Sequence, residues 1–93
     1  MKIVWDENKN RINRNKHRVN FETAQLVFDD PLHVSRQDRI EGGEQRWQTI
    51  GLVHGLILLL VAHTVIEGDG HETIRLISAR KADQTERRIY EQR

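Results

Sequence analysis

The longest apolar run of this chain is Leu56-Ile57-Leu58-Leu59-Leu60-Val61-Ala62. Both of its alternating faces are apolar, which is typical of a central strand that is covered on both sides of its sheet. The run is far shorter than the roughly 20 residues that a membrane-spanning helix needs. We therefore expect a buried strand over residues 56–66, with other elements on both faces of the sheet.

Turn residues on both sides of this run divide the surrounding sequence into further strands. His54-Gly55 precedes the run and Glu67-Gly68-Asp69-Gly70 follows it, and both stretches are typical of hairpin turns. The polar stretch from Gln37 to Glu44 reads as a mobile loop. The expected strands cover residues 32–36, 46–53, 56–66 and 71–79, with residues 2–5 as a short further candidate. The sequence thus predicts a mainly antiparallel sheet of about four strands.

The first helix is expected to follow Asp6, which is a plausible N-cap, and to run to about His17. It is unusually polar. Its apolar anchors are Trp5, Ile12 and Val19, which recur every seven residues and form a narrow stripe toward the core. The rest of the helix presents Lys, Arg and Asn side chains to solvent or to a partner.

Two further helices are marked by their end signals. Asn20 can cap a second helix that ends before Pro31. Asp83 and Glu86 have the spacing of a capping box, which starts a short C-terminal helix. The expected fold class is therefore α+β, with two helices before the sheet and one after it.

The composition limits the classes of protein to which the chain can belong. Its 93 residues fit one domain over 1–93. Fifteen Lys and Arg against fourteen Asp and Glu give a net charge of +1, so any binding to nucleic acid must rest on local clusters of charge. There is no cysteine, and the first residues lack the apolar stretch of a signal peptide, so we expect a cytoplasmic protein.

The two hairpin turns set an expected register for the sheet. With a two-residue turn at His54-Gly55 and a four-residue turn over 67–70, Trp47, Ala62 and Arg75 lie in one row on one face. The residues expected on the opposite face are Arg46, His63, Ser78 and Arg80. This register separates Arg75 from Arg80.

The residues available suit RNA cleavage without a metal, which needs a base for the 2′-hydroxyl proton, cations for the crowded phosphorane and an acid for the leaving oxygen. Arginine fits the middle role because its guanidinium donates two hydrogen bonds to one phosphate and keeps its charge. The candidates on this ground are Arg46, Arg75, Arg80 and Arg87. For Arg80, an ion pair with Glu86 or Asp83 is the competing structural interpretation.

The five histidines have no spacing that is typical of a metal site, so neither a metal nor another cofactor is expected. His63 interrupts the apolar strand, where a histidine is either part of a hydrogen-bonded core or a positioned acid or base. Lys16-His17 ends the first helix, where the helix dipole also favours a cation. Trp47 and Tyr90 can stack on unpaired bases, although Trp47 is more often core in so small a domain.

Short motifs in a fixed order run along the whole chain. The N-terminal ones are Trp5-Asp6-Glu7-Asn8-Lys9-Asn10, Asn13, Lys16-His17, Val19, Phe21, Ala24, Val27-Phe28 and Asp30-Pro31. The later ones are Glu44, Arg46-Trp47, Ile50-Gly51, His63-Thr64, Ile77-Ser78-Ala79-Arg80, Ala82, Glu86-Arg87 and Tyr90. Together they resemble the pattern of BrnT-type toxins. Arg18 stands where that family usually has glycine, so the turn between the first two helices is expected to differ.

The resemblance implies a RelE-like fold and a ribonuclease that arrests translation and growth within a bacterial type II toxin–antitoxin system. It also implies a small DNA-binding antitoxin of the BrnA type, which covers the toxin in a hetero-oligomer and with it represses their shared operon. The resemblance thus implies that RNA is the substrate and that the toxin contacts DNA only through the antitoxin.

The same resemblance implies a set of site residues. The positions that match the family pattern are Lys16, His17, Arg46, Trp47, His63, Ser78, Arg80, Glu86 and Tyr90. The hypothesised catalytic residues are Arg80, His63, His17, Lys16 and Glu86. The hypothesised RNA-binding residues are Arg46, Trp47, Arg75, Ser78, Arg87 and Tyr90. Arg80, helped by Lys16 or Arg75, is expected to stabilise the phosphorane.

Two other classes of protein stay open. The first is a non-catalytic module with a toxin-like fold that docks a partner or a ribosome. The second is a DNA-binding regulator in its own right, against which stand the near-zero net charge and the absence of a helix-turn-helix signature.

Overall fold

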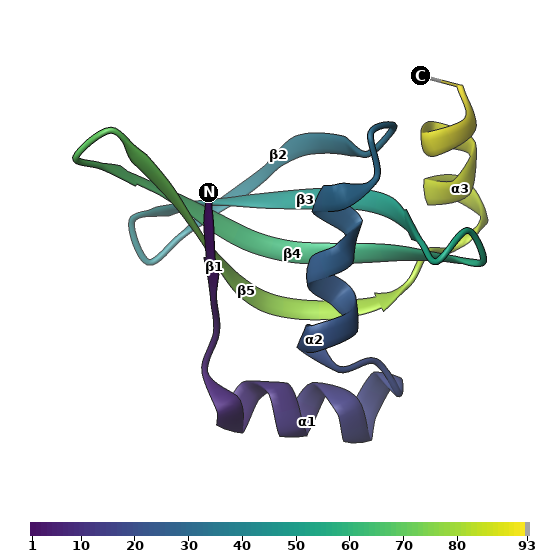
Figure 1. Cartoon of the computed structure of the whole chain (residues 1–93), viewed down its shortest axis with the longest axis horizontal. Coiled ribbons are helices and arrows are strands. Elements are labelled where there is room, and N and C mark those ends of the chain that lie inside the picture. The colour runs from purple at the N-terminus through teal and green to yellow at the C-terminus, as the bar shows by residue number, and fades with distance from the viewer. Residues whose placement is uncertain (93) are drawn as a thin grey trace.

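The computed structural model describes residues 1–92 and has an α+β fold built on a five-stranded mixed sheet (Figure 1). The strands are β1 (Lys2–Val4), β2 (Val34–Glu41), β3 (Glu44–Val53), β4 (Ile57–Gly68) and β5 (His71–Lys81). The helices are α1 (Glu7–His17), α2 (Phe21–Ala24), the 3-10 helix η1 (Gln25–Asp29) and α3 (Gln84–Glu91). The class predicted from the sequence is confirmed.

The sheet has the order β1-β5-β4-β3-β2, so the apolar run does lie in the central strand. Two details of the predicted sheet are wrong. β1 is a fifth strand that pairs in parallel with β5, because its Ile3 packs into the core beside Ile74. The predicted loop over residues 37–44 is instead the end of β2 and the start of β3, joined by a turn at Gly42-Gly43. Its residues are polar because most of their side chains lie in solvent.

The second helix also differs from the prediction in its form. Asn20 caps it as expected, since its side chain accepts a hydrogen bond of 2.8 Å from the backbone N–H of Thr23. After Ala24, however, the chain tightens into the 3-10 helix η1, a change that is common at helix ends. Arg18, with a φ of 62°, makes the left-handed turn after α1 without the glycine usual in the family.

The first helix lies beside β5 and is held there by asparagines (Figure 1). Asn13 is 5% exposed; its Nδ2 donates to the backbone oxygens of Ala79 and Val19 at 2.8 Å each, and its Oδ1 accepts from the N–H of Ala79 at 3.1 Å. The predicted apolar stripe is wrong at its centre, because Ile12 is 54% exposed. Amide hydrogen bonds take the place of that anchor.

The two faces of the sheet are covered unequally. On the first, which we call the helical face, α2 and η1 pack on a core that includes Val53, Leu59, Val61, Leu76 and Ala79. On the opposite face α3 packs only at the end near the β3–β4 hairpin. The cluster there is formed by Ile50, Leu58, Leu60 and Tyr90, flanked by Val34, Leu52, Ala82 and Ile89. The remainder of this second face is open.

The predicted register between β3 and β4 is wrong by one residue. Val53 pairs with Ile57, so the connecting loop has His54, Gly55 and Leu56 rather than two residues. His54 in this loop takes up a left-handed conformation, with a φ of 57°. A slip of one residue moves side chains to the other face. Trp47 therefore lies opposite His63 instead of Ala62.

The predicted four-residue turn over 67–70 is also wrong, because Gly68 pairs with His71 and the turn is Asp69-Gly70. A β-bulge in β5 then changes the register again. Leu76 pairs with His63 and Ser78 with Ala62, which leaves Ile77 without an opposite residue on β4. The extra residue reverses the alternation of side chains along the strand. Arg75 and Arg80 therefore lie on the same face, although one has an odd and the other an even number.

Candidate functional site

The open part of the second sheet face carries Arg36, Arg46 and Arg75, and Arg80 lies at its border with the cluster under α3. We call the surface that these four arginines form the arginine face. The cross-strand rows that place them are Arg46–Thr64–Arg75, Arg36–Gln48–Ala62–Ser78 and Val34–Ile50–Leu60–Arg80. The first and last rows are four residues apart on β4, or about 13 Å. This spacing lets Arg75 and Arg80 contact one extended strand of RNA.

Carboxylates from the β2–β3 hairpin pair with two of these arginines. Arg75 Nη2 lies 2.6 Å from Glu44 Oε1, and Arg46 Nη2 lies 3.9 Å from Glu41 Oε2. The side chains of Arg75 and Glu44 are 39% and 41% exposed. Ion pairs with that much solvent contact contribute about 0–1 kcal/mol. A phosphate oxygen can replace such a carboxylate at little cost.

The row that joins Arg46, Thr64 and Arg75 contains polar atoms without partners. Within residues 1–92, Arg46 Nε, Thr64 Oγ1 and Arg75 Nε are buried and make no hydrogen bond. Leaving such a group unsatisfied costs on the order of 1–3 kcal/mol. This row is therefore short of hydrogen-bond acceptors.

Arg80 is paired with Glu86 on α3, as the competing structural interpretation held. Its Nη1 and Nη2 each lie 2.8 Å from a different carboxylate oxygen of Glu86. Glu86 Oε1 also accepts from the backbone N–H of Asp83 at 2.9 Å, which completes the predicted capping box. The hydrogen bonds from Arg80 lower the pKa of Glu86, and Glu86 in turn raises the pKa of Arg80. The carboxylate is thus ionised and fixes the plane of the guanidinium of Arg80, whose side chain is still 39% exposed.

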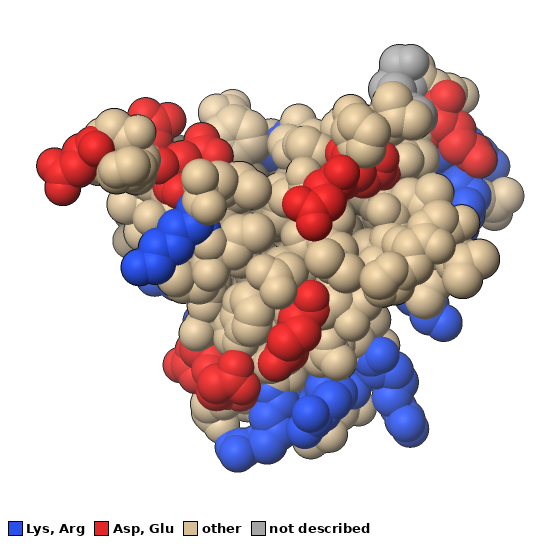
Figure 2. Space-filling view, in the orientation of Figure 1, with Lys and Arg blue, Asp and Glu red and all other residues tan. Residues whose placement is uncertain are grey.

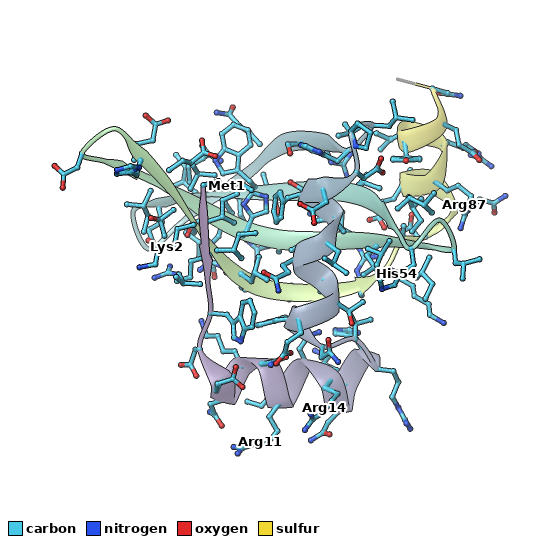
Figure 3. All side chains as sticks on the ribbon, in the orientation of Figure 1. Met1, Lys2, Arg11, Arg14, His54 and Arg87 are labelled. Carbon is cyan, nitrogen blue, oxygen red and sulfur yellow. The ribbon has the colours of Figure 1, made fainter. Side chains whose placement is uncertain are left out.

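A cavity of about 220 Å³ between α1 and β5 brings three of the predicted residues together. Lys16, His17 and Ser78 line it, with Lys9, Ile12, Asn13 and Ile77. Ser78 belongs to the arginine face as well, so the end of α1 adds an ammonium and an imidazole to the border of that face. Figure 2 shows Lys and Arg gathered over α1, and Figure 3 shows Arg11 and Arg14 pointing away from the sheet.

His63 and Trp47 lie on the helical face, away from the arginines. The prediction that His63 lies beside Arg46 is therefore wrong, because of the register shift. His63 is 2% exposed, its Nε2 lies 2.7 Å from the hydroxyl of Thr49, and its ring meets that of Phe28 edge to face at 5.1 Å. Burial lowers the pKa of His63 to about 4. Its imidazole is neutral at neutral pH and forms part of the core.

Tyr90 and Arg87, on α3, fall outside the centre of the arginine face. Tyr90 packs on Ile50 and Leu60, and its hydroxyl donates to Asp30 Oδ2 at 2.6 Å, so its ring is not presented to a base. Arg87 is exposed beside the β3–β4 hairpin (Figure 3).

The titration of His63 makes stability depend on pH. The unfolded chain binds a proton near pH 6.5 and the folded chain only near pH 4, so stability is complete above 6.5 and falls as the pH drops toward 4. We expect a loss of about 2 kcal/mol between about pH 7.5 and pH 5 in urea unfolding. His63→Gln can still bond to Thr49 but cannot titrate, and should lose about 2 kcal/mol less. Equal losses in both proteins would contradict the assignment.

Sequence reasoning missed Arg36, Gln48 and Thr64 as parts of the arginine face. Arg36 Nε and Nη2 donate to Gln48 Oε1 at 3.1 and 3.0 Å. The alternation of polar residues in β2 and β3 was the available signal, but it could be used only with the correct register. Within residues 1–92, no group of three or more His, Asp or Glu is placed to hold a metal ion. No helix of that part is long and apolar enough to cross a membrane.

Comparison with known proteins agrees with the family resemblance. Residues 5–86 match the model of a family described as the ribonuclease toxin BrnT of type II toxin–antitoxin systems. The crystal structure of the Brucella abortus ribonuclease toxin BrnT is similar, with 32% identity, a TM-score of 0.65, and coverage of 90% of this chain and 99% of that one. Among curated proteins, none matches. The chain belongs to the BrnT family of ribonuclease toxins from type II toxin–antitoxin systems.

Proposed function

We propose that this chain is a metal-independent endoribonuclease that cuts RNA on the arginine face. The observation that carries the proposal is that four arginines, Ser78 and the Lys16–His17 end of α1 meet at the only broad part of the sheet that α3 leaves uncovered among residues 1–92. Because the net charge is +1, this local cluster rather than a general field has to attract the RNA.

Binding is assigned to the rows that contain Arg36, Arg46 and Arg75. Their guanidiniums donate to phosphate oxygens, which displace Glu41 and Glu44 and supply the acceptors that the Arg46–Thr64–Arg75 row lacks. Trp47 lies on the helical face and the ring of Tyr90 is packed on the core, so neither stacks on a base. The contacts with the RNA backbone therefore hold the RNA without regard to its bases.

Cleavage is assigned to Arg80 and the neighbouring end of α1. The 2′-oxygen attacks phosphorus and passes its proton to a base, Arg80 stabilises the phosphorane, and the departing 5′-oxygen takes up a proton. The products are a 2′,3′-cyclic phosphate and a 5′-hydroxyl. Histidine is suited to proton transfer near neutral pH, and His17 is the histidine at this border. Glu86 acts as a positioning residue for Arg80.

In the cell, the proposal places the toxin in the cytoplasm, where it cuts mRNA, stops translation and arrests growth. A BrnA-type antitoxin neutralises it. Family membership supports this setting, since a type II toxin has an antitoxin partner. The proposed reaction follows the metal-independent RNA cleavage of RelE-like ribonucleases.

The test uses the purified chain and a single-stranded RNA. Cleavage should persist in EDTA, and Arg75→Ala should raise KM about tenfold with little change in kcat, because it removes a phosphate contact. The slope of log KM against log salt should fall by about 0.7. Arg11→Ala, on the outer side of α1, is the matched control and should behave as the wild type (Figure 3). Cleavage that stops in EDTA and returns with Mg²⁺ would refute metal independence, and no cleavage at all would favour the partner-binding module.

A further inference from the structure

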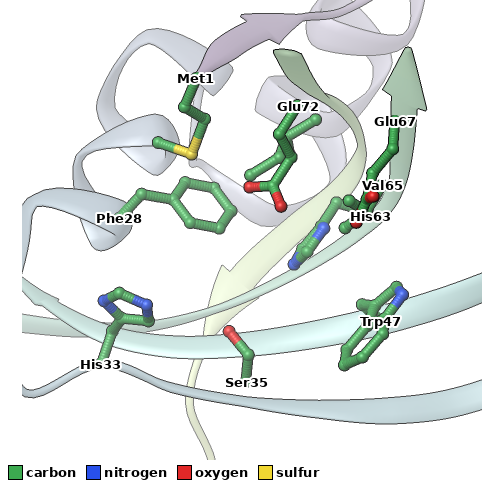
Figure 4. Close-up of a pocket in the computed structure, with 10 residues that line it drawn as sticks. Met1, Phe28, His33, Ser35, Trp47, His63, Val65, Glu67 and Glu72 are labelled. Carbon is green, nitrogen blue, oxygen red and sulfur yellow. The ribbon is translucent and has the colours of Figure 1, made fainter. Parts of the chain in front are cut away.

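A second cavity lies on the helical face, on the other side of the sheet from the arginines. It has a volume of about 470 Å³ and is lined by Met1, Phe28, His33, Ser35, Trp47, His63, Val65, Glu67, Glu72 and Ile74 (Figure 4). The size is typical of pockets that hold a small organic group. Two aromatic rings and aliphatic side chains form its walls, and two carboxylates are its only acidic groups. We call it the aromatic–acidic pocket.

The two carboxylates oppose one another. Glu67 pairs directly with Glu72 across β4 and β5, and both side chains are on the helical face. Like charges at directly opposite positions destabilise a sheet. Within residues 1–92, neither glutamate forms an ion pair with Lys, Arg or His. Figure 2 shows acidic side chains gathered at the end of the molecule that the β4–β5 hairpin forms in Figure 1. The fold thus maintains an uncompensated negative site above an apolar cavity.

A long cationic side chain fits this combination. Lysine and arginine have aliphatic stems that can lie along the apolar walls, and a charged end that can reach the carboxylates. Trp47 adds a ring face to which a cation is attracted. RNA fits poorly, since its phosphates would be repelled by Glu67 and Glu72. The pocket is therefore matched to a basic segment of a protein.

We propose that the aromatic–acidic pocket is a docking site for the antitoxin and receives a lysine or arginine side chain from it. The proposal rests on the partner that family membership implies and not on cleavage at the arginine face. Charge complementarity identifies the occupant. A buried basic anchor in an aromatic pocket is the kind of contact on which binding energy concentrates.

The experiment measures binding of the antitoxin encoded beside this gene, by calorimetry, to the wild type and to Glu67→Gln/Glu72→Gln. The double variant keeps the size of both side chains and removes both charges. We expect affinity to fall on the order of 30-fold, and its dependence on salt to weaken. The free variant should be at least as stable as the wild type, because the repulsion is gone. If the two glutamates had only a structural role, the double variant would be less stable than the wild type and would keep its affinity for the antitoxin.

Two controls locate the effect. Asp69→Asn removes a charge from the tip of the same hairpin, outside the lining of the pocket, and should leave affinity within about threefold of the wild type. The chain has two tryptophans, and in a Trp5→Phe variant Trp47 is the one that remains. The fluorescence emission of Trp47 should change when the antitoxin binds. Unchanged affinity in the double variant together with unchanged Trp47 emission would overturn the proposal.

The ribonuclease assay separates this proposal from the proposed function. Glu67→Gln/Glu72→Gln should cut RNA as the wild type does, because neither residue lies on the arginine face. Lost antitoxin affinity in a chain that never cuts RNA would sustain the docking site and refute the cleavage. If Glu67→Gln/Glu72→Gln instead lost RNA affinity and kept antitoxin affinity, the docking site would be overturned.

Discussion

Arg80→Gln is expected to lower kcat for RNA cleavage by on the order of 10²–10³-fold, the effect of removing a group that stabilises charge in a transition state. Its side chain is 39% exposed on the arginine face, and its guanidinium is held in plane by two hydrogen bonds of 2.8 Å to Glu86. KM should change much less than kcat. The measurement is steady-state cleavage of a defined RNA at a temperature where both proteins are fully folded.

Glu86→Gln is the matched control, since it breaks the same ion pair but leaves the guanidinium. Glutamine can replace glutamate in the capping box, so α3 should still form. We expect its kcat to stay within about tenfold of the wild type. Arg80→Gln/Glu86→Gln, which buries no unpaired charge, should be as inactive as Arg80→Gln alone. If Glu86→Gln and Arg80→Gln lose activity equally, then Arg80 has only a structural role.

Gly51→Ala is expected to destabilise the fold by about 3 kcal/mol, a large value for the addition of one methyl group. Gly51 lies in β3 directly under η1. A Cβ at this position would be 2.7 Å from both Cβ and the backbone oxygen of Val27 and 2.9 Å from its Cα. Backbone atoms cannot rotate away, so η1 would have to lift from the sheet. Urea unfolding of the two proteins measures the difference.

Gly68→Ala is the control for this substitution. Gly68 also lies in a strand and has an ordinary φ, but a Cβ at this position would have no neighbouring atom within 4 Å. Its replacement should leave the free energy of unfolding within about 0.5 kcal/mol of the wild type. Equal unfolding midpoints for Gly51→Ala and the wild type would show that η1 does not need the close approach.

The elements of this fold follow from local signals, whereas their pairing does not. The caps at Asp6, Asn20 and Asp83 and the apolar run of β4 act over a few residues, and each lies where the sequence predicts. β1 was recognised as a β candidate, but its parallel partner could not be. β1 has only three residues, and their pattern does not identify a partner strand that lies more than sixty residues later in the chain.

The site depended on the register, which is why it could be predicted only in part. Arg46, Arg75, Ser78 and Arg80 were named correctly as residues that lie on the sheet, but Arg75 was placed on the wrong face. The reasons are the left-handed His54 and the bulge at Ile77. Neither residue type is sufficient to specify its conformation, and tertiary packing decides both. The placement of Lys16 and His17 beside Ser78 followed from the Asn13 contacts, which no periodicity reveals.

The two margins of the sheet have a bearing on self-association. An unpaired strand is a template on which another chain can add, the first step toward domain swapping or fibrils. β1 covers the edge of β5 only at residues 73–75, and beyond it the amide of Asn13 occupies the N–H and C=O of Ala79 that an incoming strand would need. At the other margin, β2 is interrupted by a register shift between Gln37 and Ile40 and is rich in charged residues. Both places are thus protected against polymerisation through the sheet of this chain.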